Sequence, residues 1–258
     1  MAAMLARARL RAEAESTRKT GACMNGWQSL LRVLWVLGVA GAIAVAALRT
    51  STLWARIRSR KPNSLATHAM MAGVSIAGIY LASGGRWSGF GLGVGTFKWS
   101  PILLLWVLPT AVLMIPQVAT SRGRASADSH HLRPAQTIVR VWLAASIAEE
   151  LLTRGLIQGL LAPFSGVGFH VGTDSVTVPI LLAALAFAAL HLILVRRMGA
   201  KATPVILLAF LLGCVAGVYR ETTGSLIPAV IVHMLFNIGG TIPLWLARRS
   251  RTRTTTSQ

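Results

Sequence analysis

Long apolar runs alternate with short basic or turn-forming segments along this chain. A membrane helix needs about 20 mostly apolar residues to cross roughly 30 Å of hydrocarbon. Seven stretches are interpreted as membrane helices on this basis, and they are 29–48, 65–83, 101–119, 137–162, 177–195, 204–219 and 226–247. Basic clusters follow several of these runs, which supports helices that end at the membrane surface.

The Gly-rich stretch 84–95 is the main uncertainty in this pattern. It is too broken for a span and is interpreted as a loop or a re-entrant piece, so the count is seven or eight helices. The predicted organisation is a basic N-terminal tail at 1–28, N-terminal transmembrane helices at 29–130, a transmembrane core at 131–247 and a basic tail at 248–258. The fold class is therefore an all-α, polytopic transmembrane helical bundle.

The N-terminal tail superficially resembles a signal peptide, because five basic residues precede an apolar run that ends in small residues. Both the basic region and the apolar run are long for a signal peptide, so an uncleaved first helix is favoured. A surface-lying amphipathic tail and a start at Met24 stay open.

Composition excludes a soluble enzyme. Of the 258 residues, 54% are hydrophobic and 13% are charged, and the mean hydropathy is +0.62. Twenty-six Lys and Arg against seven Asp and Glu give a net charge of +19. Because the basic residues cluster between apolar runs, the partners we expect for them are anionic lipid headgroups and not nucleic acid. Cys23 and Cys214 form no disulfide or zinc pattern.

The basic residues also predict an orientation. With seven spans, 16 Lys and Arg fall on the side of the C-terminal tail and nine on the other side. The more basic side is usually cytoplasmic, which places the C-terminus in the cytoplasm. The basic N-terminal tail argues the other way, and an eighth span would put both tails on the cytoplasmic side. The Ala- and Arg-rich composition is typical of a bacterium with a G+C-rich genome, so the plasma membrane of a bacterium is expected.

Two adjacent acidic residues fall inside a predicted span. A charge at the bilayer centre costs about 2.5–3.5 kcal/mol, so Glu149 and Glu150 must be compensated. Arg154 lies one helical turn after Glu150 and can pair with it. Glu149 points about 100° away around the helix and is left without a fixed cation. A carboxylate in that position is suited to act as a general base.

Two further spans carry polar groups at helical spacing. Phe187 and His191 are four residues apart, and so are His233 and Asn237. Histidine and asparagine can donate hydrogen bonds to an oxyanion, and histidine can also bind a metal or move a proton. Counted along the helices, Glu149 and the two histidines reach similar depths, so one cavity near mid-membrane can contain all three.

Each of these groups also has a structural explanation. The glutamate pair can belong to an ion-pair network, and His191 can bind a helix backbone. His233 and Asn237 can join two helices by hydrogen bonds. His68 lies within the second span without a matching partner and is interpreted as structural or interfacial. Glu221, next to Arg220 at a helix end, is expected to form a surface ion pair.

Together the three motifs resemble the CPBP family of intramembrane proteases, named for CAAX proteases and bacteriocin-processing enzymes and also labelled Abi. Its motifs are a Glu-Glu pair with an Arg after three intervening residues, a Phe with His four residues on, and a His with Asn or Asp four residues on. The chain has all three in this order, as Glu149, Glu150 and Arg154, then Phe187 and His191, then His233 and Asn237. The resemblance covers about residues 139–240.

The resemblance implies a polytopic helical protease that cleaves peptide bonds inside or beside the membrane. It implies that Glu149 and His191 activate a water molecule, while His233 and Asn237 bind the oxyanion. Arg154 would hold Glu150 and the local helix, and Phe187 supports the second motif. The expected substrate is a membrane-associated peptide or protein, because prenylated CAAX substrates are not expected in a bacterium.

The resemblance leaves open whether a metal takes part. Glu149, His191 and His233 could hold zinc, as in a metalloprotease, with a water in the fourth position. No compact HExxH motif is present, and a metal-free glutamate mechanism is favoured. No other cofactor is expected.

Two other classes of function use the same residues. A proton- or ion-coupled transporter could use the buried glutamates and histidines as a relay, but the inverted repeat often found in transporters is not detected. A non-catalytic membrane scaffold is the third hypothesis. The order of the motifs favours the protease, and the sequence does not determine the oligomeric state.

Overall fold

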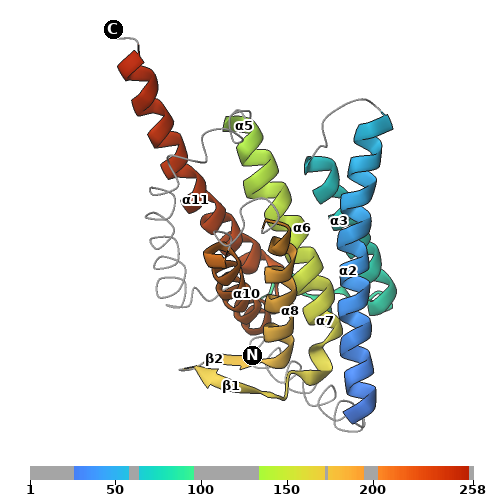
Figure 1. Ribbon diagram of the computed structural model, residues 1–258. Coiled ribbons are helices and arrows are strands. Elements are labelled where there is room, and N and C mark those ends of the chain that lie inside the picture. The colour runs from blue at the N-terminus through green and yellow to red at the C-terminus, as the bar shows by residue number, and fades with distance from the viewer. Residues whose placement is uncertain (1–25, 58–63, 96–133, 172–173, 195–202, 256–258) are drawn as a thin grey trace.

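The computed structural model describes residues 26–57, 64–95, 134–171, 174–194 and 203–255, and most of them are helical (Figure 1). The longer helices are α2 (Gly26–Ile57), α3 (Ser64–Ser83), α8 (Val178–Leu190), α10 (Thr203–Thr223) and α11 (Leu226–Thr255). A short 3-10 helix, η7 (His191–Leu194), continues α8. Helices were therefore predicted correctly for every proposed span in the described residues, whereas the proposed span 101–119 lies outside them.

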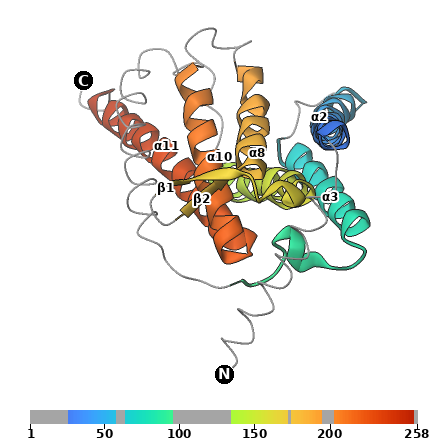
Figure 2. The same ribbon diagram turned by 90° about the horizontal axis from the view of Figure 1, so that it is seen from below.

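A central helix runs through the bundle from Pro134 to Leu160. It consists of α5 (Pro134–Thr137), η4 (Ile138–Ala145), α6 (Ser146–Glu150), η5 (Leu151–Ile157) and α7 (Gln158–Leu160). The segments η4 and η5 are π-helical, and they flank α6, which carries the glutamate pair. π-Helical turns are rare and often occur at functional sites. The central helix separates α2 and α3 on one side from α8, α10 and α11 on the other (Figures 1 and 2).

One apolar core joins the N-terminal helices to the central helix. It contains Val36 and Ala40 of α2, Met71 and Ile79 of α3, Leu152 and Leu156 of η5, Ala183 of α8 and Leu226 of α11. A second cluster lies among α8, α10 and α11 and includes Phe187, Leu212, Tyr219 and Val232. The first cluster packs the glutamate-bearing helix against its neighbours, and the second packs α8, α10 and α11 against one another.

Two glycines allow α8 and α10 to approach closely. Gly213 and Gly217 are four residues apart on α10, the spacing that lets membrane helices bring their backbones together. A Cβ added at Gly213 would lie 2.8 Å from the Cα of Ala184, and one at Gly217 would lie 2.9 Å from Cγ2 of Ile180. Because backbone and branched side-chain atoms form these contacts, little space remains for a larger residue.

The Gly-rich stretch forms a loop and not a span. It contains the short 3-10 helix η1 (Trp87–Phe90) and binds the start of α11. The Leu226 N–H donates to the carbonyl of Gly91 at 2.8 Å, and Ser225 Oγ donates to the carbonyl of Gly93 at 2.7 Å. Gly91 has φ 80°, a conformation that favours glycine. The loop that follows α3 is therefore hydrogen-bonded to the α10–α11 turn.

A β-hairpin interrupts the helices where only a loop was expected. Strands β1 (Gly168–Val171) and β2 (Asp174–Thr177) pair antiparallel, with Gly168 opposite Thr177. The central helix ends shortly before η6 (Ala162–Phe164), in which Pro163 cannot donate a helical hydrogen bond. Four-residue strands carry too weak a periodic signal to stand out between apolar helices.

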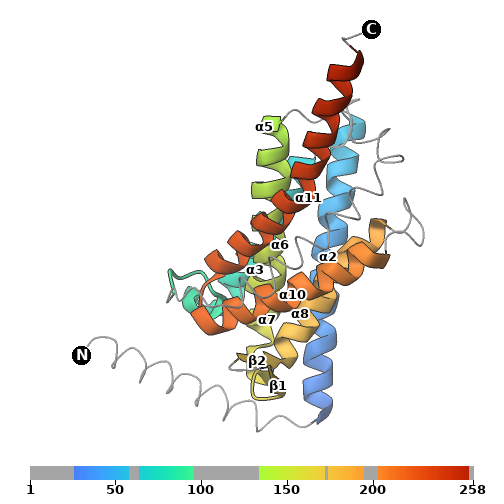
Figure 3. The same cartoon turned by 90° about the vertical axis from the view of Figure 1, so that its left-hand side faces the viewer.

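Three described helices are long and apolar enough to cross a membrane, and they are 26–47, 64–83 and 203–223. Val178–Leu190 and Leu226–Gly239 are shorter apolar helices. These findings identify an integral membrane protein but confirm three of the seven predicted spans by length and composition. Helix α11 continues beyond the bundle toward the C-terminus (Figure 3).

We expect Gly213→Ala to lower the free energy of unfolding by about 1–3 kcal/mol, because the added methyl group meets the backbone of α8. Gly73→Ala on α3 is the matched control, since a Cβ there meets nothing within 4 Å. The control should be neutral or stabilise the protein by up to about 1 kcal/mol. Denaturation of the purified variants in detergent measures both effects. Equal stability of the two variants would contradict the close packing.

Candidate active site

Glu150 and Arg154 form a buried ion pair on the central helix. Both side chains are 0% exposed, and Nη1 of Arg154 lies 3.0 Å from Oε1 of Glu150. Nη1 also donates to Thr153 Oγ1 at 2.5 Å, and the guanidinium carbon lies 4.6 Å from the ring centre of Phe187. A buried pair requires such additional contacts to offset its desolvation. The predicted pairing of Glu150 with Arg154 is confirmed.

His233 connects this ion pair to Glu149. The histidine lies on α11 and is buried. Its Nδ1 is 2.9 Å from Oε1 of Glu150, and its Nε2 is 3.8 Å from Oε2 of Glu149. The edge-to-face contact with Phe187, at 5.2 Å between ring centres, holds the imidazole plane. Glu150 therefore fixes one nitrogen of His233 while the other faces Glu149.

The Glu149 carboxylate lies between two imidazoles from different helices. Oε2 faces His233, and Oε1 lies 4.0 Å from Nε2 of His68 on α3. Both separations exceed hydrogen-bonding distance, and the side chain is 17% exposed. Its backbone carbonyl accepts a 2.6 Å hydrogen bond from Thr153 Oγ1, which anchors the local helix. As predicted, no Lys or Arg pairs with Glu149 among the described residues, and the ionisable groups that face it are the two imidazoles.

The His191 ring contacts the Phe187 ring, which in turn contacts the His233 ring. Nδ1 of His191 lies 2.9 Å from the Phe187 carbonyl, so this nitrogen carries the proton and Nε2 is left as an acceptor. The His191 and Phe187 rings meet at 4.9 Å between centres. Within the described residues, no hydrogen bond or ion pair connects His191 to Glu149. The structure thus places His191 against Phe187 and does not bring it into contact with the acid that it was predicted to assist.

Asn237 follows His233 by one turn and holds α11 against the central helix. Its amide nitrogen donates to the carbonyl of Val141 at 3.1 Å and to Ser146 Oγ at 3.0 Å. The amide would have to leave these partners to reach an oxyanion, so its predicted oxyanion role stays a prediction. In the present geometry, Asn237 fixes the depth of His233.

Comparison with known families identifies this region of the chain. The model of the Rce1-like family, type II CAAX prenyl endopeptidase Rce1-like, matches residues 132–239. This segment belongs to the CAAX protease family. The match confirms the resemblance drawn from the three motifs, all of which lie inside the Rce1-like segment. No curated protein and no solved structure matches the chain significantly.

Two side chains outside the motifs have different partners from those predicted. His68 lies outside the Rce1-like segment and was interpreted as lacking a partner, but it faces Glu149. The signal that could have identified it is the one that identified the glutamates, an ionisable residue within an apolar run. Glu221 and Arg220 attract each other electrostatically, but Arg220 is buried, and the direct contacts of both side chains within the described residues are with other groups. Glu221 accepts hydrogen bonds from Thr177 and Gln158, while Arg220 donates to the carbonyl of Gly89.

The zinc site expected from Glu149, His191 and His233 stays a prediction. Among the residues that the structure describes, no group of three or more His, Cys, Asp and Glu is placed to hold a metal ion. In the expected set, Nδ1 of His191 contacts the Phe187 carbonyl and Nδ1 of His233 contacts Glu150, while no hydrogen bond engages Nε2 of either histidine among the described residues. A metal-ligating histidine commonly has its second nitrogen hydrogen-bonded in this way.

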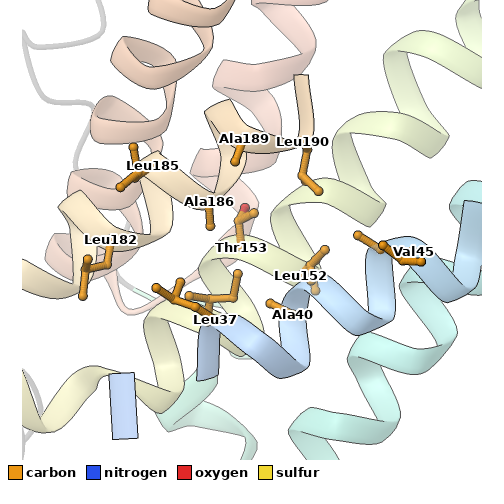
Figure 4. Close-up of a pocket in the computed structure, with 13 residues that line it drawn as sticks. Leu37, Ala40, Val45, Leu152, Thr153, Leu182, Leu185, Ala186, Ala189 and Leu190 are labelled. Carbon is orange, nitrogen blue, oxygen red and sulfur yellow. The ribbon is translucent and has the colours of Figure 1, made fainter. Parts of the chain in front are cut away.

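An apolar pocket of about 450 Å³ borders the Rce1-like segment between α2, η5 and α8 (Figure 4). Thirteen residues line it, and all except Thr153 are apolar or glycine. Leu152 and Thr153 of its wall lie one turn after Glu149, and Ala189 and Leu190 immediately precede His191. The pocket therefore shares the central helix and α8 with the candidate active site.

The buried ion pair provides a double-mutant test. Arg154→Met leaves the Glu150 carboxylate buried without its guanidinium, so we expect the free energy of unfolding to fall by about 3–5 kcal/mol. Adding Glu150→Gln removes the orphaned charge and should recover part of that loss. Denaturation of both single variants and the double variant gives the coupling energy. Additive losses would contradict the pairing.

Proposed function

We propose that this protein is an intramembrane endopeptidase in which Glu149 acts as a general base on a water molecule. The observation that carries the proposal is the position of the Glu149 carboxylate between two imidazoles, one of them fixed by the buried Glu150–Arg154 pair. The match to a family of CAAX endopeptidases supports peptide-bond hydrolysis as the reaction.

His233 is the oxyanion donor in this mechanism. Its Nδ1 lies 2.9 Å from Oε1 of Glu150, and its Nε2 faces the site. The mechanism requires the imidazolium form of His233 when the oxyanion develops, because that form donates from both nitrogens.

The reaction then proceeds in two steps. Glu149 accepts a proton from water while the water oxygen attacks the carbonyl carbon of the scissile peptide bond. The negative charge that develops on the former carbonyl oxygen is stabilised by the Nε2–H of His233. Glu149 returns its proton to the amide nitrogen as the C–N bond breaks, which releases a carboxylic acid and an amine.

His191 and Asn237 support this reaction in the proposal. The free Nε2 of His191 is a proton acceptor that can orient the water, since Nδ1 is held by the Phe187 carbonyl. Asn237 holds His233 in place, and it can add an oxyanion contact if its amide leaves the central helix in the substrate complex.

The proposed substrate is a membrane-associated peptide or protein. The apolar pocket beside the Rce1-like segment supports this class, because it can accept a hydrophobic segment of the substrate while the scissile bond reaches Glu149. We further propose that the protein lies in a bacterial plasma membrane, with its C-terminus in the cytoplasm and its basic clusters on anionic headgroups.

The central test is Glu149→Gln. Loss of the general base should reduce peptide cleavage by about 10²–10⁴-fold while the protein still inserts and folds. Membrane peptides from strains with wild-type protein and with Glu149→Gln can be compared by mass spectrometry, and cleavage of the identified peptide is then measured in proteoliposomes. Asp174→Asn on the hairpin is the matched acid-to-amide control and should keep full activity.

Full cleavage by the Glu149→Gln variant would reject the proposed mechanism. Proton or ion flux in liposomes that depends on Glu149, with no cleavage by the wild-type protein, would instead support the transporter hypothesis.

The pocket gives an independent test of substrate class. Gly41 lines the pocket and a Cβ there meets nothing within 4 Å, so the ring in Gly41→Phe should occupy part of the pocket. We expect kcat/KM for a membrane-anchored peptide to fall about tenfold, equivalent to losing roughly 55 Å² of apolar contact. Gly38→Phe, on the same helix but outside the pocket lining, is the control. Equal activity of the two variants would show that the substrate does not bind in this pocket.

A further inference from the structure

His68 brings a third imidazole to the candidate active site. It lies on α3, outside the Rce1-like segment and its three motifs. Its Nε2 lies 4.0 Å from Oε1 of Glu149, and the side chain is 20% exposed. Because α3 packs against the central helix through Met71 and Ile79, His68 is held close to the acid by the apolar core.

Among the described residues, Glu149 is the ionisable group that faces the His68 ring. Nδ1 of His68 is buried and has no hydrogen-bond partner among the described residues. By contrast, Nδ1 of His233 is bound to Glu150. The one charged group that the described contacts place at His68 is therefore the Glu149 carboxylate, whose other oxygen faces His233. A partly buried imidazole next to a single carboxylate oxygen is suited to hold that oxygen.

Glu149 requires such a contact to work as a general base. The terminal torsion of a glutamate is broad, so a carboxylate without a hydrogen bond samples many orientations. Only one oxygen needs to face the water, and a hydrogen bond to the other oxygen would fix the group in a productive orientation. The present 4.0 Å separation is about 1 Å too long for that bond, and catalytic hydrogen bonds often tighten in the substrate complex.

We propose that His68 is a positioning residue that holds Oε1 of Glu149 through its Nε2–H, so that Oε2 is directed at the water and His233. This inference rests on the proposed function and adds a residue of α3 to the site. The N-terminal helices then contribute to the active site itself and not to the membrane anchor alone.

Three variants at position 68 separate this role from a structural one. His68→Leu keeps an apolar side chain of comparable size but removes the donor, and kcat should fall about 10–100-fold with KM nearly unchanged. His68→Gln retains an N–H donor at a similar reach and should recover most of the activity. In the Glu149→Gln background, His68→Leu should have no further effect. Full activity of His68→Leu, or equal losses in the Leu and Gln variants, would overturn the proposal.

A second measurement does not depend on proteolysis. In protein with ¹⁵N-labelled histidine, the ring signals of His68 are assigned by their loss in His68→Gln. These signals should shift in Glu149→Gln and stay unchanged in Asp174→Asn. If the wild-type protein cleaves no peptide, the proposed function fails, yet this experiment still decides whether His68 holds Glu149. Unchanged His68 signals in Glu149→Gln would reject the inference even in an active protease.

Discussion

The structure depends on the compensation of two adjacent carboxylates among apolar membrane helices. Water would normally solvate these charges, so each must find its partner inside the protein. Glu150 has Arg154 and His233 within direct contact, and both partners are buried with it. Glu149 has no partner at hydrogen-bonding distance, and its carboxylate lies between two imidazoles. Glu150 is thus paired through Oε1, while its buried Oε2 has no hydrogen-bond partner among the described residues, and Glu149 has no direct contact of this kind.

The surrounding helices are packed to maintain this difference. The close approach of α10 to α8 at Gly213 places the α10 backbone next to Arg154, since an added Cβ there would lie 3.0 Å from Nη2. Phe187 of α8 lies over the Arg154 guanidinium and also contacts the ring of His233 on α11. Asn237 and Thr241 connect α11 to the central helix on the C-terminal side of His233. Small movements of any of these helices would change the distances around Glu149.

The sequence was sufficient to predict the parts of this site that obey local rules. The Glu150–Arg154 pair follows from a spacing of four residues, and the candidate acid follows from the cost of burying a charge. The partner of His68 could not be predicted, because it depends on how α3 packs against a helix about 80 residues away in the chain. The π-helical segments that flank α6, the β1–β2 hairpin and the contacts of Asn237 with Val141 and Ser146 likewise arise from tertiary packing.

The central helix carries both Glu149 and one wall of the apolar pocket. The proposed general base and the proposed substrate-binding surface therefore share one helix. Thr153 lines the pocket, and its hydroxyl donates to the backbone carbonyl of Glu149 and accepts a hydrogen bond from Arg154. One side chain therefore contacts the pocket, the Glu149 backbone and the buried ion pair. A hydrophobic segment entering between α2 and α8 would meet the helix one turn beyond Glu149. Because lipid surrounds the helices, such a segment can arrive without crossing water, whereas the water to be activated must reach the partly exposed Glu149. In the proposed intramembrane hydrolase, both routes would meet at the Glu149 carboxylate, which is 17% exposed, whereas the Glu150 side chain beside it is 0% exposed.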